Sequence, residues 1–471
     1  MTVTEETRET SETPVARAGY DAALERLRTQ LLAMPVDAPV RLAKRTSNLF
    51  RPRTALTGRG LDVSGFDAVL SVDPEARTAD VGGMTTYEDL VDATLPYGLM
   101  PSVVPQLKTI TLGGAVSGLG IESSSYRNGL PHEAVLEMDV LTGAGEVVTA
   151  RRDEGEHADL VAGLPNSYGT LGYAMRLRIA LQPVRPVVRL DHLRFDDAGA
   201  FFAAMAGVCA DNSWQGRQVD FVDGVAFAPD ELVLSIGSFV DAAPARVELS
   251  DYTGMAIFYR SVQRGGTEYL SVRDYLWRWD TDWFWCSRTF GVQNPRIRWW
   301  VPKRWLRSDY YARIVRLEGR YGVRRRIDRA RGLPERENVI QDVEVPIERA
   351  AQFLAAFDEQ VAIRPVWTCP LRVLRPQGWP LYPMEPDKLY VNFGFWTSVA
   401  LAPGESDGTY NRRVEELVAA HNGHKSLYST AFYDPDTFWR LYNGPAYRGL
   451  KDRYDPQGRL LDLYDKCVRR N

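Results

Sequence analysis

The strongest pattern along the chain is a strict alternation of apolar and polar positions between Tyr173 and Leu181. Positions 173, 175, 177, 179 and 181 are apolar, and small or polar residues separate them, which predicts a half-buried strand. Pro183 and Pro186 follow at once, and proline interrupts both strands and helices. We therefore place a domain boundary at residue 186.

Two hairpins and one helix are predicted before this boundary. The hairpin strands are residues 68–72 with 77–81, and residues 134–141 with 146–149. Between the hairpins, Thr85 or Thr86 is placed to cap a helix that continues to Leu95. The first part of the chain is therefore expected to be mainly strands, with one well-formed helix.

The pattern after residue 186 predicts a mixture of helices and strands. The elements with the clearest periodicity are a strand over 339–345, a helix over 347–361, strands over 363–373 and 388–397, and a helix over 410–420. Asp434 and Pro435 then begin a short helix as its N-cap and first residue. Residues 1–16 are rich in Thr and Glu and lack an apolar stretch, so we expect a disordered tail and no signal peptide.

Residues 105–130 form a stretch with few bulky side chains. It contains five glycines: Gly113, Gly114, Gly118, Gly120 and Gly129. Glycine reaches positive φ at little cost and permits close approach, so the backbone amides of such a stretch can gather around an anion. We interpret the stretch as a pyrophosphate cradle for a dinucleotide, and the alternative is a long glycine loop without a ligand.

This cradle differs from a Rossmann turn. Gly118-Leu-Gly120 lacks the third glycine of that motif, and residues 123–129 predict a polar turn where the motif needs a helix. The chain also lacks the glycine-rich Lys-Ser/Thr motif of nucleotide hydrolases, which excludes that class.

Composition sets further limits. A chain of 471 residues can hold two domains, and 45% hydrophobic and 25% charged residues are typical of a soluble protein. The net charge of −4 argues against a nucleic-acid partner. Four scattered cysteines suit a reducing cytoplasm, and no run of 18 apolar residues predicts a membrane span. His421 and His424 have no acidic or cysteine neighbour with ligand spacing, so we expect no metal site.

Four motifs carry a resemblance to known flavoproteins. The hairpin, helix and loop order around Thr111–Gly114 resembles the FAD-binding domain of the vanillyl-alcohol-oxidase superfamily. Gly120–Ser125 is similar to the loop of Δ24-sterol reductases, while Leu42–Phe50 and Asn166–Gly172 resemble actinobacterial flavin reductases that make tuberculostearic acid. The resemblance implies an α+β fold: a PCMH-type FAD-binding domain of two α/β subdomains, and an α+β substrate domain with an antiparallel sheet. The implied divisions are a tail at 1–16, the FAD-binding domain at 17–186, the substrate domain at 187–420, and a segment at 421–471 that returns to the flavin domain.

The resemblance also implies where FAD binds. In this superfamily the first loop, here residues 45–48, meets the pyrophosphate opposite the glycine cradle, and many relatives carry there a histidine bonded to the flavin. This chain has no histidine in the loop, so we expect FAD to be held without a covalent link, with charge from Arg45 and hydrogen bonds from Asn48. A plain strand-to-loop turn is the alternative. The residues assigned to FAD are Arg45, Thr46, Ser47, Asn48, Pro105, Gln106, Thr109, Thr111, Gly113, Gly114, Gly118, Gly120, Ile121, Ser124, Gly169 and Gly172.

The activity that the resemblance implies is reduction of an isolated lipid alkene by FAD and NADPH. The first hypothesis is conversion of a 10-methylene acyl chain on a phospholipid to the 10-methyl chain. The alternatives are a Δ24-sterol or polyprenoid side-chain reductase, an oxidase of a lipid-linked sugar, and a lipid-binding protein on a degenerate flavin fold. Ala431 stands where decaprenylphosphoryl-ribose oxidases, which this chain resembles in residues 424–428, have a lysine, and this argues against the oxidase.

Reduction of such an alkene needs a proton donor besides the hydride. The candidate catalytic residues are His424 and Tyr428, then Glu122, Asp342 and Asp282, with Lys425 as a replacement for the lysine absent at 431. Glu122 can instead cap the loop, and Asp342 or Gln341 can instead bond the flavin rim. The expected substrate-pocket residues are Trp283, Gln341, Trp367, Cys369, Asn392 and Trp396.

Seven of the twelve tryptophans lie between residues 277 and 305, mixed with arginine and lysine. This mixture is typical of lipid headgroup regions, and the alternative is a domain core in which arginine stacks on indoles. We expect the first stretch to line the pocket and the second to touch a membrane through Trp299, Trp300, Trp305, Arg296, Arg298, Lys303 and Arg304. The expected location is the cytoplasm, at the inner leaflet, with a lipid substrate and a methyltransferase as partner.

Overall fold

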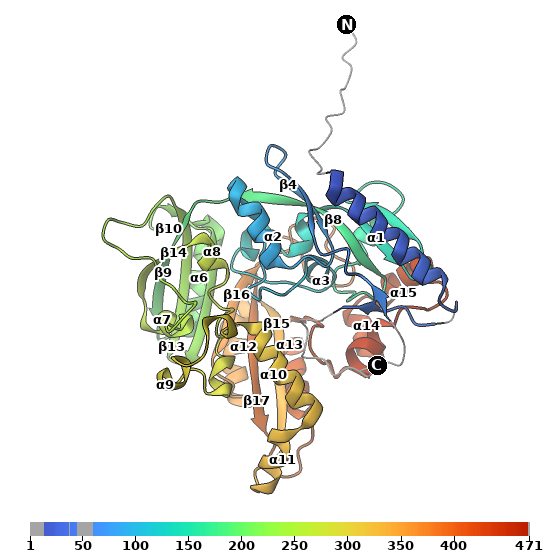
Figure 1. The fold of residues 1–471 in the computed structure, drawn as a ribbon. Coiled ribbons are helices and arrows are strands. Elements are labelled where there is room, and N and C mark those ends of the chain that lie inside the picture. Colours follow the sequence, from blue (N-terminus) through green and yellow to red (C-terminus); the bar gives the residue numbers. More distant parts are fainter. Residues whose placement is uncertain (1–13, 37, 45–59, 470–471) are drawn as a thin grey trace.

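The computed structural model describes residues 14–36, 38–44 and 60–469, which form two large β-sheets and two sheets of two strands each, with helices packed around them (Figure 1). The first sheet has six antiparallel strands and the second has eight. Each part combines helices with antiparallel strands, so the predicted α+β fold class is confirmed. No helix in these described ranges has both the length and the apolar character that a membrane span needs.

The first part contains the sheet β3-β4-β8-β6-β7, with β5 paired to β8. Its elements are α1 (Pro14–Leu32), β1 (Leu42–Ala43), β2 (Leu61–Asp62), β3 (Val69–Asp73), β4 (Thr78–Gly82), α2 (Tyr87–Thr94), η1 (Leu95–Tyr97), β5 (Leu99–Pro101), α3 (Leu112–Ser117), α4 (Ser125–Asn128), η2 (Pro131–Ala134), β6 (Val135–Thr142), β7 (Val147–Arg151), α5 (Ala158–Gly163) and β8 (Gly172–Pro183).

The predicted elements of this part are present. Both hairpins form, as β3–β4 and β6–β7, and the alternating strand is β8 at the centre of the sheet. Thr86 is the residue that caps α2, because its Oγ1 accepts the N–H of Asp89 at 3.2 Å. The element types could be predicted here because each segment has one clear periodicity.

The glycine stretch is partly helical, which differs from the prediction. Residues 112–117 form helix α3, and residues 125–128 form one helical turn where we predicted only a polar turn. Of its five glycines only Gly129 has positive φ, at 69°. A Cβ on Gly113 would lie 2.7 Å from the carbonyl oxygen of Gly83, and one on Gly120 would lie 2.8 Å from Pro131. The close contacts at Gly113 and Gly120 use the other property of glycine considered for this stretch, its tolerance of close approach.

The second part contains the sheet β14-β9-β13-β12-β16-β17-β15-β18. Its elements are β9 (Val187–Phe195), α6 (Ala198–Asp211), β10 (Ser213–Trp214), β11 (Arg217–Gln218), β12 (Phe221–Ala228), β13 (Glu231–Val240), α7 (Phe258–Arg264), β14 (Gly266–Ser271), α8 (Val272–Leu276), η3 (Cys286–Phe290), α9 (Pro295–Arg298), η4 (Lys303–Trp305), α10 (Ser308–Tyr321), α11 (Val323–Ala330), β15 (Arg336–Pro346), α12 (Ile347–Gln360), β16 (Val366–Leu371), β17 (Tyr390–Ala400), α13 (Thr409–Ala420) and β18 (His424–Lys425).

The two faces of the second sheet have different neighbours. Helices α6, α12 and α13 cover one face and bury an aliphatic and phenylalanine core with it. The other face packs against the aromatic segment 275–285, and this core continues without a break into the first part. Residues that project from this second face, called the aromatic face below, therefore point toward the junction of the two parts.

The chain ends by returning to the first part. β18 pairs with β15, so residues 424–425 belong to the second sheet, and α14 (Pro435–Leu441), α15 (Gly444–Tyr454) and a short π-helix (Asp465–Arg469) follow. Figure 1 shows α14 and α15 beside the first part, where Lys451 Nζ donates to the carbonyl of Thr170 at 2.8 Å. The last segment thus closes the junction from one side.

Candidate active site

Glu122 ties together the two ends of the glycine stretch. Its Oε1 accepts the backbone N–H of Gln106 at 2.9 Å, and its Oε2 accepts Gln106 Nε2 at 2.7 Å. The backbone N–H of Glu122 donates to Ser125 Oγ at 3.0 Å. The side chain is buried, and burial raises the pKa of its carboxyl to about 8. Glu122 therefore closes the stretch into a loop, which is the alternative role considered for it above.

The first predicted FAD loop begins beside this stretch. Lys44 Nζ donates to Thr111 Oγ1 at 3.2 Å, and the same oxygen accepts the N–H of Gly114 at 3.3 Å as the N-cap of α3. Residues Arg45, Thr46, Ser47 and Asn48 lie outside the described residues, so their assignment stays a prediction. The sequence argument did not select Lys44, although a second cation next to Arg45 was a usable signal.

A third segment, residues 166–172, reaches the same place. Gly169 has φ 77° in a tight turn, and a Cβ on Gly172 would lie 2.6 Å from Val140. The ring of Tyr168 lies 3.3 Å from where a Cβ of Gly118 would be, and Lys466 Nζ donates to the Tyr168 carbonyl. Lys44, the glycine stretch and this turn therefore meet at the junction.

The remaining residues assigned to FAD have mixed positions. Pro105 and Ile121 pack against the loop and its core, while the hydroxyl of Ser124 donates to the carbonyl of Ser102 at 2.9 Å. Ser124 is thus committed to the loop itself.

Two buried polar atoms test whether a dinucleotide fits this place. Gln106 Oε1 and Thr85 Oγ1 are buried and have no hydrogen-bond partner among the described residues. Buried polar groups are nearly always paired, so these atoms are available to a polar ligand. Together with the ammonium of Lys44 and the close backbone at Gly113 and Gly114, they give a site that fits an anionic cofactor with polar groups.

The aromatic face of the second sheet contributes a directed chain of hydrogen bonds. Trp396 Nε1 donates to the Tyr428 hydroxyl at 3.0 Å, and the Tyr428 hydroxyl bonds Asp342. Asn392 Nδ2 also donates to Asp342 Oδ1 at 3.0 Å. Burial raises the pKa of the Asp342 carboxyl to about 6, and burial with the nearby carboxylate raises the pKa of Tyr428 well above its usual value.

The strand register explains why these groups meet. Asp342 lies opposite Gly394 in the β15–β17 pair, and Trp396 lies two residues further along β17, so all three share a face. A Cβ on Gly394 would lie 2.5 Å from Asp342 Oδ1 and 2.8 Å from the Trp396 ring. Gly394, which the sequence argument did not select, therefore makes the space in which Asp342 and Trp396 sit.

Comparison with known proteins identifies FAD as the cofactor of this protein. Residues 35–151 match the FAD binding domain family, and this matched range includes Lys44 and the glycine stretch. The protein is a flavin-dependent oxidoreductase. It is 26% identical to Delta(24)-sterol reductase of Arabidopsis thaliana over 438 residues, or 86% of this chain and 76% of the relative. It is 27% identical to Delta(24)-sterol reductase of Homo sapiens, over 85% of this chain and 76% of the relative. Cytokinin dehydrogenase 7 of rice (Oryza sativa) is 37% identical over 126 residues, 27% of this chain and 24% of the relative.

In this oxidoreductase, aromatic rings pack around Trp396, which belongs to the Asp342 cluster. The Phe284 ring lies 4.3 Å from that of Trp396 and 5.6 Å from that of Trp367, and Trp285 lies 5.5 Å from Trp396. Trp283 and Phe284 both have positive φ, at 44° and 60°. Bulky residues rarely adopt this conformation, and it commonly marks a functional site where packing maintains the strain. The sequence argument found Trp283, Trp367 and Trp396 but missed Phe284.

Three predicted residues lie away from this flavoenzyme's site. Lys425 and Gln341 project from the opposite face of the sheet, where Lys425 Nζ pairs with Glu415 at 2.6 Å and Gln341 Nε2 donates to Asn411 of α13. Asp282 is held by two bonds from Arg298, at 2.6 and 3.0 Å. Strand parity turns Lys425 and Gln341 to the helix-covered face, and an ion pair holds Asp282, so none of the three joins the Asp342 cluster and their assigned roles stay predictions.

His424 and Cys369 both project from the aromatic face, but their neighbours and the shifts of their pKa values differ. His424 lies opposite Glu344 and close to the rings of Tyr382 and Tyr390, and burial lowers the pKa of its imidazole to about 4. It is therefore neutral at pH 7 and a weak proton donor. Cys369 lies opposite Asn392, and burial raises the pKa of its thiol. Ala431 is buried and its N–H donates to the Cys467 carbonyl at 3.2 Å.

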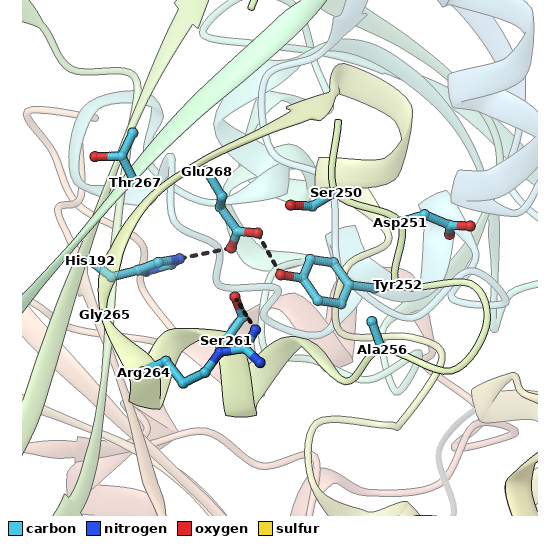
Figure 2. A pocket seen from close by; sticks show the side chains of 10 residues that line it. All are labelled: His192, Ser250, Asp251, Tyr252, Ala256, Ser261, Arg264, Gly265, Thr267 and Glu268. Carbon is cyan, nitrogen blue, oxygen red and sulfur yellow. Dashed lines mark hydrogen bonds and ion pairs between the residues drawn. The ribbon is translucent and has the colours of Figure 1, made fainter. Parts of the chain in front are cut away.

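A polar pocket of about 370 Å³ lies at the other end of the second sheet (Figure 2). His192 bonds Glu268 Oε1 at 2.9 Å and Ser235 Oγ at 2.8 Å, and the Tyr252 hydroxyl donates to Glu268. Four strands separate β9 from β15, which places this pocket about 24 Å from Asp342 at the usual strand spacing. It is thus a separate structure, with its polar groups bonded to one another.

Proposed function

We propose that this oxidoreductase reduces an isolated carbon–carbon double bond in the hydrocarbon part of a lipid, with NADPH as the electron donor. The observation that carries the proposal is the chain from Trp396 through Tyr428 to Asp342, set among aromatic walls at the flavin site. The similarity to Delta(24)-sterol reductases supports a sterol or polyprenoid side chain as the substrate. It supports this alternative better than the 10-methylene acyl chain.

FAD would be held by Lys44, Thr111, the loop closed by Glu122 and the turn at Gly169, and in reduced form it supplies the hydride. An isolated alkene has no group that stabilises negative charge, so one of its carbons must receive a proton as the other receives hydride.

Tyr428 is placed to give that proton. When Asp342 is protonated, its carboxyl can donate to the Tyr428 oxygen, which frees the phenolic proton for the alkene carbon. Trp396 Nε1 donates to the same oxygen and stabilises the charge that develops as the proton leaves. The balance is one hydride from NADPH and one proton from solvent through Asp342, added across the double bond.

The walls support this step in two ways. They exclude water, which strengthens the hydrogen bonds around Tyr428. The faces of Phe284, Trp367 and Trp396 also carry negative charge density, which stabilises positive charge developing at a substituted carbon of the substrate.

The test uses holoenzyme that NADPH has reduced without oxygen. A sterol with a side-chain alkene, a 10-methylene phospholipid and a lipid-linked sugar are then added separately, and recovery of the flavin absorbance is followed. We expect the sterol-type alkene to reoxidise the flavin, and a reaction in D₂O to place one deuterium in the product. If no alkene reoxidises the flavin, the proposal is wrong.

The 10-methylene acyl chain is the second candidate, because residues 42–50 and 166–172 resemble the flavin reductases described above. The two alkenes separate in the same experiment, since faster reoxidation by the methylene phospholipid would select this candidate. A methyltransferase would then have to supply its substrate.

A further inference from the structure

The two tryptophan stretches have opposite environments. Trp277, Trp279, Trp283 and Trp285 are all buried in the junction. Trp299, Trp300 and Trp305 are exposed by 69%, 78% and 46%, and Ile297 is exposed by 47%. Indole rings of this size are rarely left in water on a soluble surface, and a contiguous group of them marks an interaction site. We call residues 296–331, which form α9 to α11, the basic aromatic surface.

One buried and one partly exposed ion pair hold this surface against the rest of the protein. Arg298 is only 2% exposed, bonds Asp282 twice, and donates to the carbonyl of Gly254 at 2.7 Å. It therefore cannot touch a membrane as predicted, and instead anchors the turn that presents Trp299 and Trp300. Arg307 pairs with Glu88 of α2 at 2.7 Å, which fixes the start of α10 to the first part.

Helix α10 continues the apolar part of this surface. Tyr311 is buried, whereas Ile314, Leu317 and Tyr321 are exposed by 46%, 55% and 53% at helical spacing. The Trp305 ring stacks at 6.1 Å on Tyr310, which lies on the same side of α10 as Leu317. The stripe thus extends the exposed tryptophans along the helix, and α10 and α11 extend from the lower edge of the second part in Figure 1.

Charge distinguishes this surface from the rest of the chain. Among the side chains of this surface that the structure describes, eight arginines and lysines are exposed and two acidic residues are partly exposed, within a chain whose net charge is −4. Cations beside indole and aliphatic side chains complement an anionic bilayer, because cations meet phosphates while rings and methyl groups enter the headgroup region. Nucleic acid would use the arginines but gives no role to Ile297, Ile314 and Leu317.

We propose that the basic aromatic surface docks this enzyme on the face of an anionic phospholipid bilayer. The contact goes beyond the proposed reaction, and binding to vesicles is measured without substrate or turnover. If the protein binds vesicles but reduces no alkene, the proposed function is wrong and the proposed membrane docking still holds.

The experiment is flotation of the purified full chain with vesicles of phosphatidylcholine alone, or of phosphatidylcholine with phosphatidylglycerol. We expect binding to the anionic vesicles to be at least about tenfold tighter and to weaken as salt is added. Trp299→Ala with Trp300→Ala should lower binding about tenfold. Tyr97→Ala, which removes an aromatic ring exposed by 56% in the first part, should leave binding unchanged.

A charge reversal tests the contribution of the cations on the basic aromatic surface. Arg313→Glu with Arg316→Glu should abolish the preference for anionic vesicles, while Arg185→Glu, an exposed cation elsewhere, should preserve it. Unchanged circular dichroism confirms that each variant is folded. Equal binding to both vesicles, no binding to either, or binding only to duplex DNA or an acidic protein would each overturn the proposal.

Discussion

Two carboxyl groups at the junction, Glu122 and Asp342, have raised pKa values for the same reason but occupy different surroundings. Burial raises the pKa of Glu122 to about 8 and that of Asp342 to about 6. Glu122 receives both its bonds from Gln106 and is enclosed by the loop that it closes. Asp342 is half-buried and bonds the hydroxyl of Tyr428, a residue that is also half-buried. A raised pKa therefore does not identify a proton donor unless a path leads outward from the group.

Removing the phenolic proton should have the largest effect. Tyr428→Phe keeps the ring but loses the hydroxyl between Trp396 and Asp342, so we expect alkene reduction to fall about 100-fold or more. Reduction of the flavin by NADPH should be unchanged, because it does not use this proton. Stopped-flow measurement gives the rates of flavin reduction and of alkene reduction separately. An equal loss in both rates would show that Tyr428 has a structural role only.

Asp342→Asn should come next, with a loss of about tenfold to 100-fold. The donor must be protonated, and its protonated fraction falls as pH rises through about 6, so wild-type alkene reduction should slow above that pH. The variant has no group to titrate there and should show a flat profile. Rates of the oxidative half-reaction between pH 5 and 8 check this, and an unchanged fall in the variant would exclude Asp342.

Gly394→Ala tests the space around the same carboxyl. The new Cβ would lie 2.5 Å from Asp342 Oδ1, so we expect displacement of the carboxyl and about a tenfold loss of alkene reduction with FAD retained. Gly207→Ala is the matched control, because Gly207 lies in α6 with no atom within 4 Å of the new Cβ. The control should keep full activity and gain slight thermal stability. Similar kinetic losses in both variants would count against the special position of Gly394.

Glu122→Gln should have the smallest kinetic effect and act on stability. A carboxyl whose pKa rises on folding holds its proton in the native protein, so wild-type stability should fall as pH rises from about 5 to 8. The amide cannot titrate, so the variant should lose this dependence while its kinetic pH profile stays that of the wild type. Thermal unfolding at several pH values measures the pH dependence of stability in both proteins. A kinetic pH profile of Glu122→Gln that differs from that of the wild type would give Glu122 a catalytic role.

The sequence predicted the regular elements better than it predicted side-chain direction. The hairpins, α2, β8, α12 and α13 each have one dominant periodicity, and all are present. Gln341 was assigned to the substrate pocket, although the alternation along its strand places it on the other face. It has the same parity as Val339, Val343 and Val345, which face the helices. Asp342 has the opposite parity and projects from the aromatic face.

Other parts of the site depend on tertiary structure that no local pattern encodes. Lys425 belongs to a strand of two residues, so its partner Glu415 could not be inferred from spacing. Trp283 and Phe284 adopt positive φ without a glycine to signal it, because ring packing imposes that backbone. The assignments at 45–48 stay predictions.

The bond between Arg298 and Asp282 has a mechanical consequence. Asp282 directly precedes Trp283 and Phe284, the pair with positive φ whose second ring packs on Trp396, while Arg298 directly precedes the exposed Trp299. One buried ion pair therefore connects an exposed tryptophan of the basic aromatic surface to the buried aromatic wall of the junction. If membrane binding at Trp299 shifts the Phe284 ring and so changes the affinity for substrate, thermodynamic linkage requires a reciprocal effect. Bound substrate must then change the affinity for the membrane by the same factor.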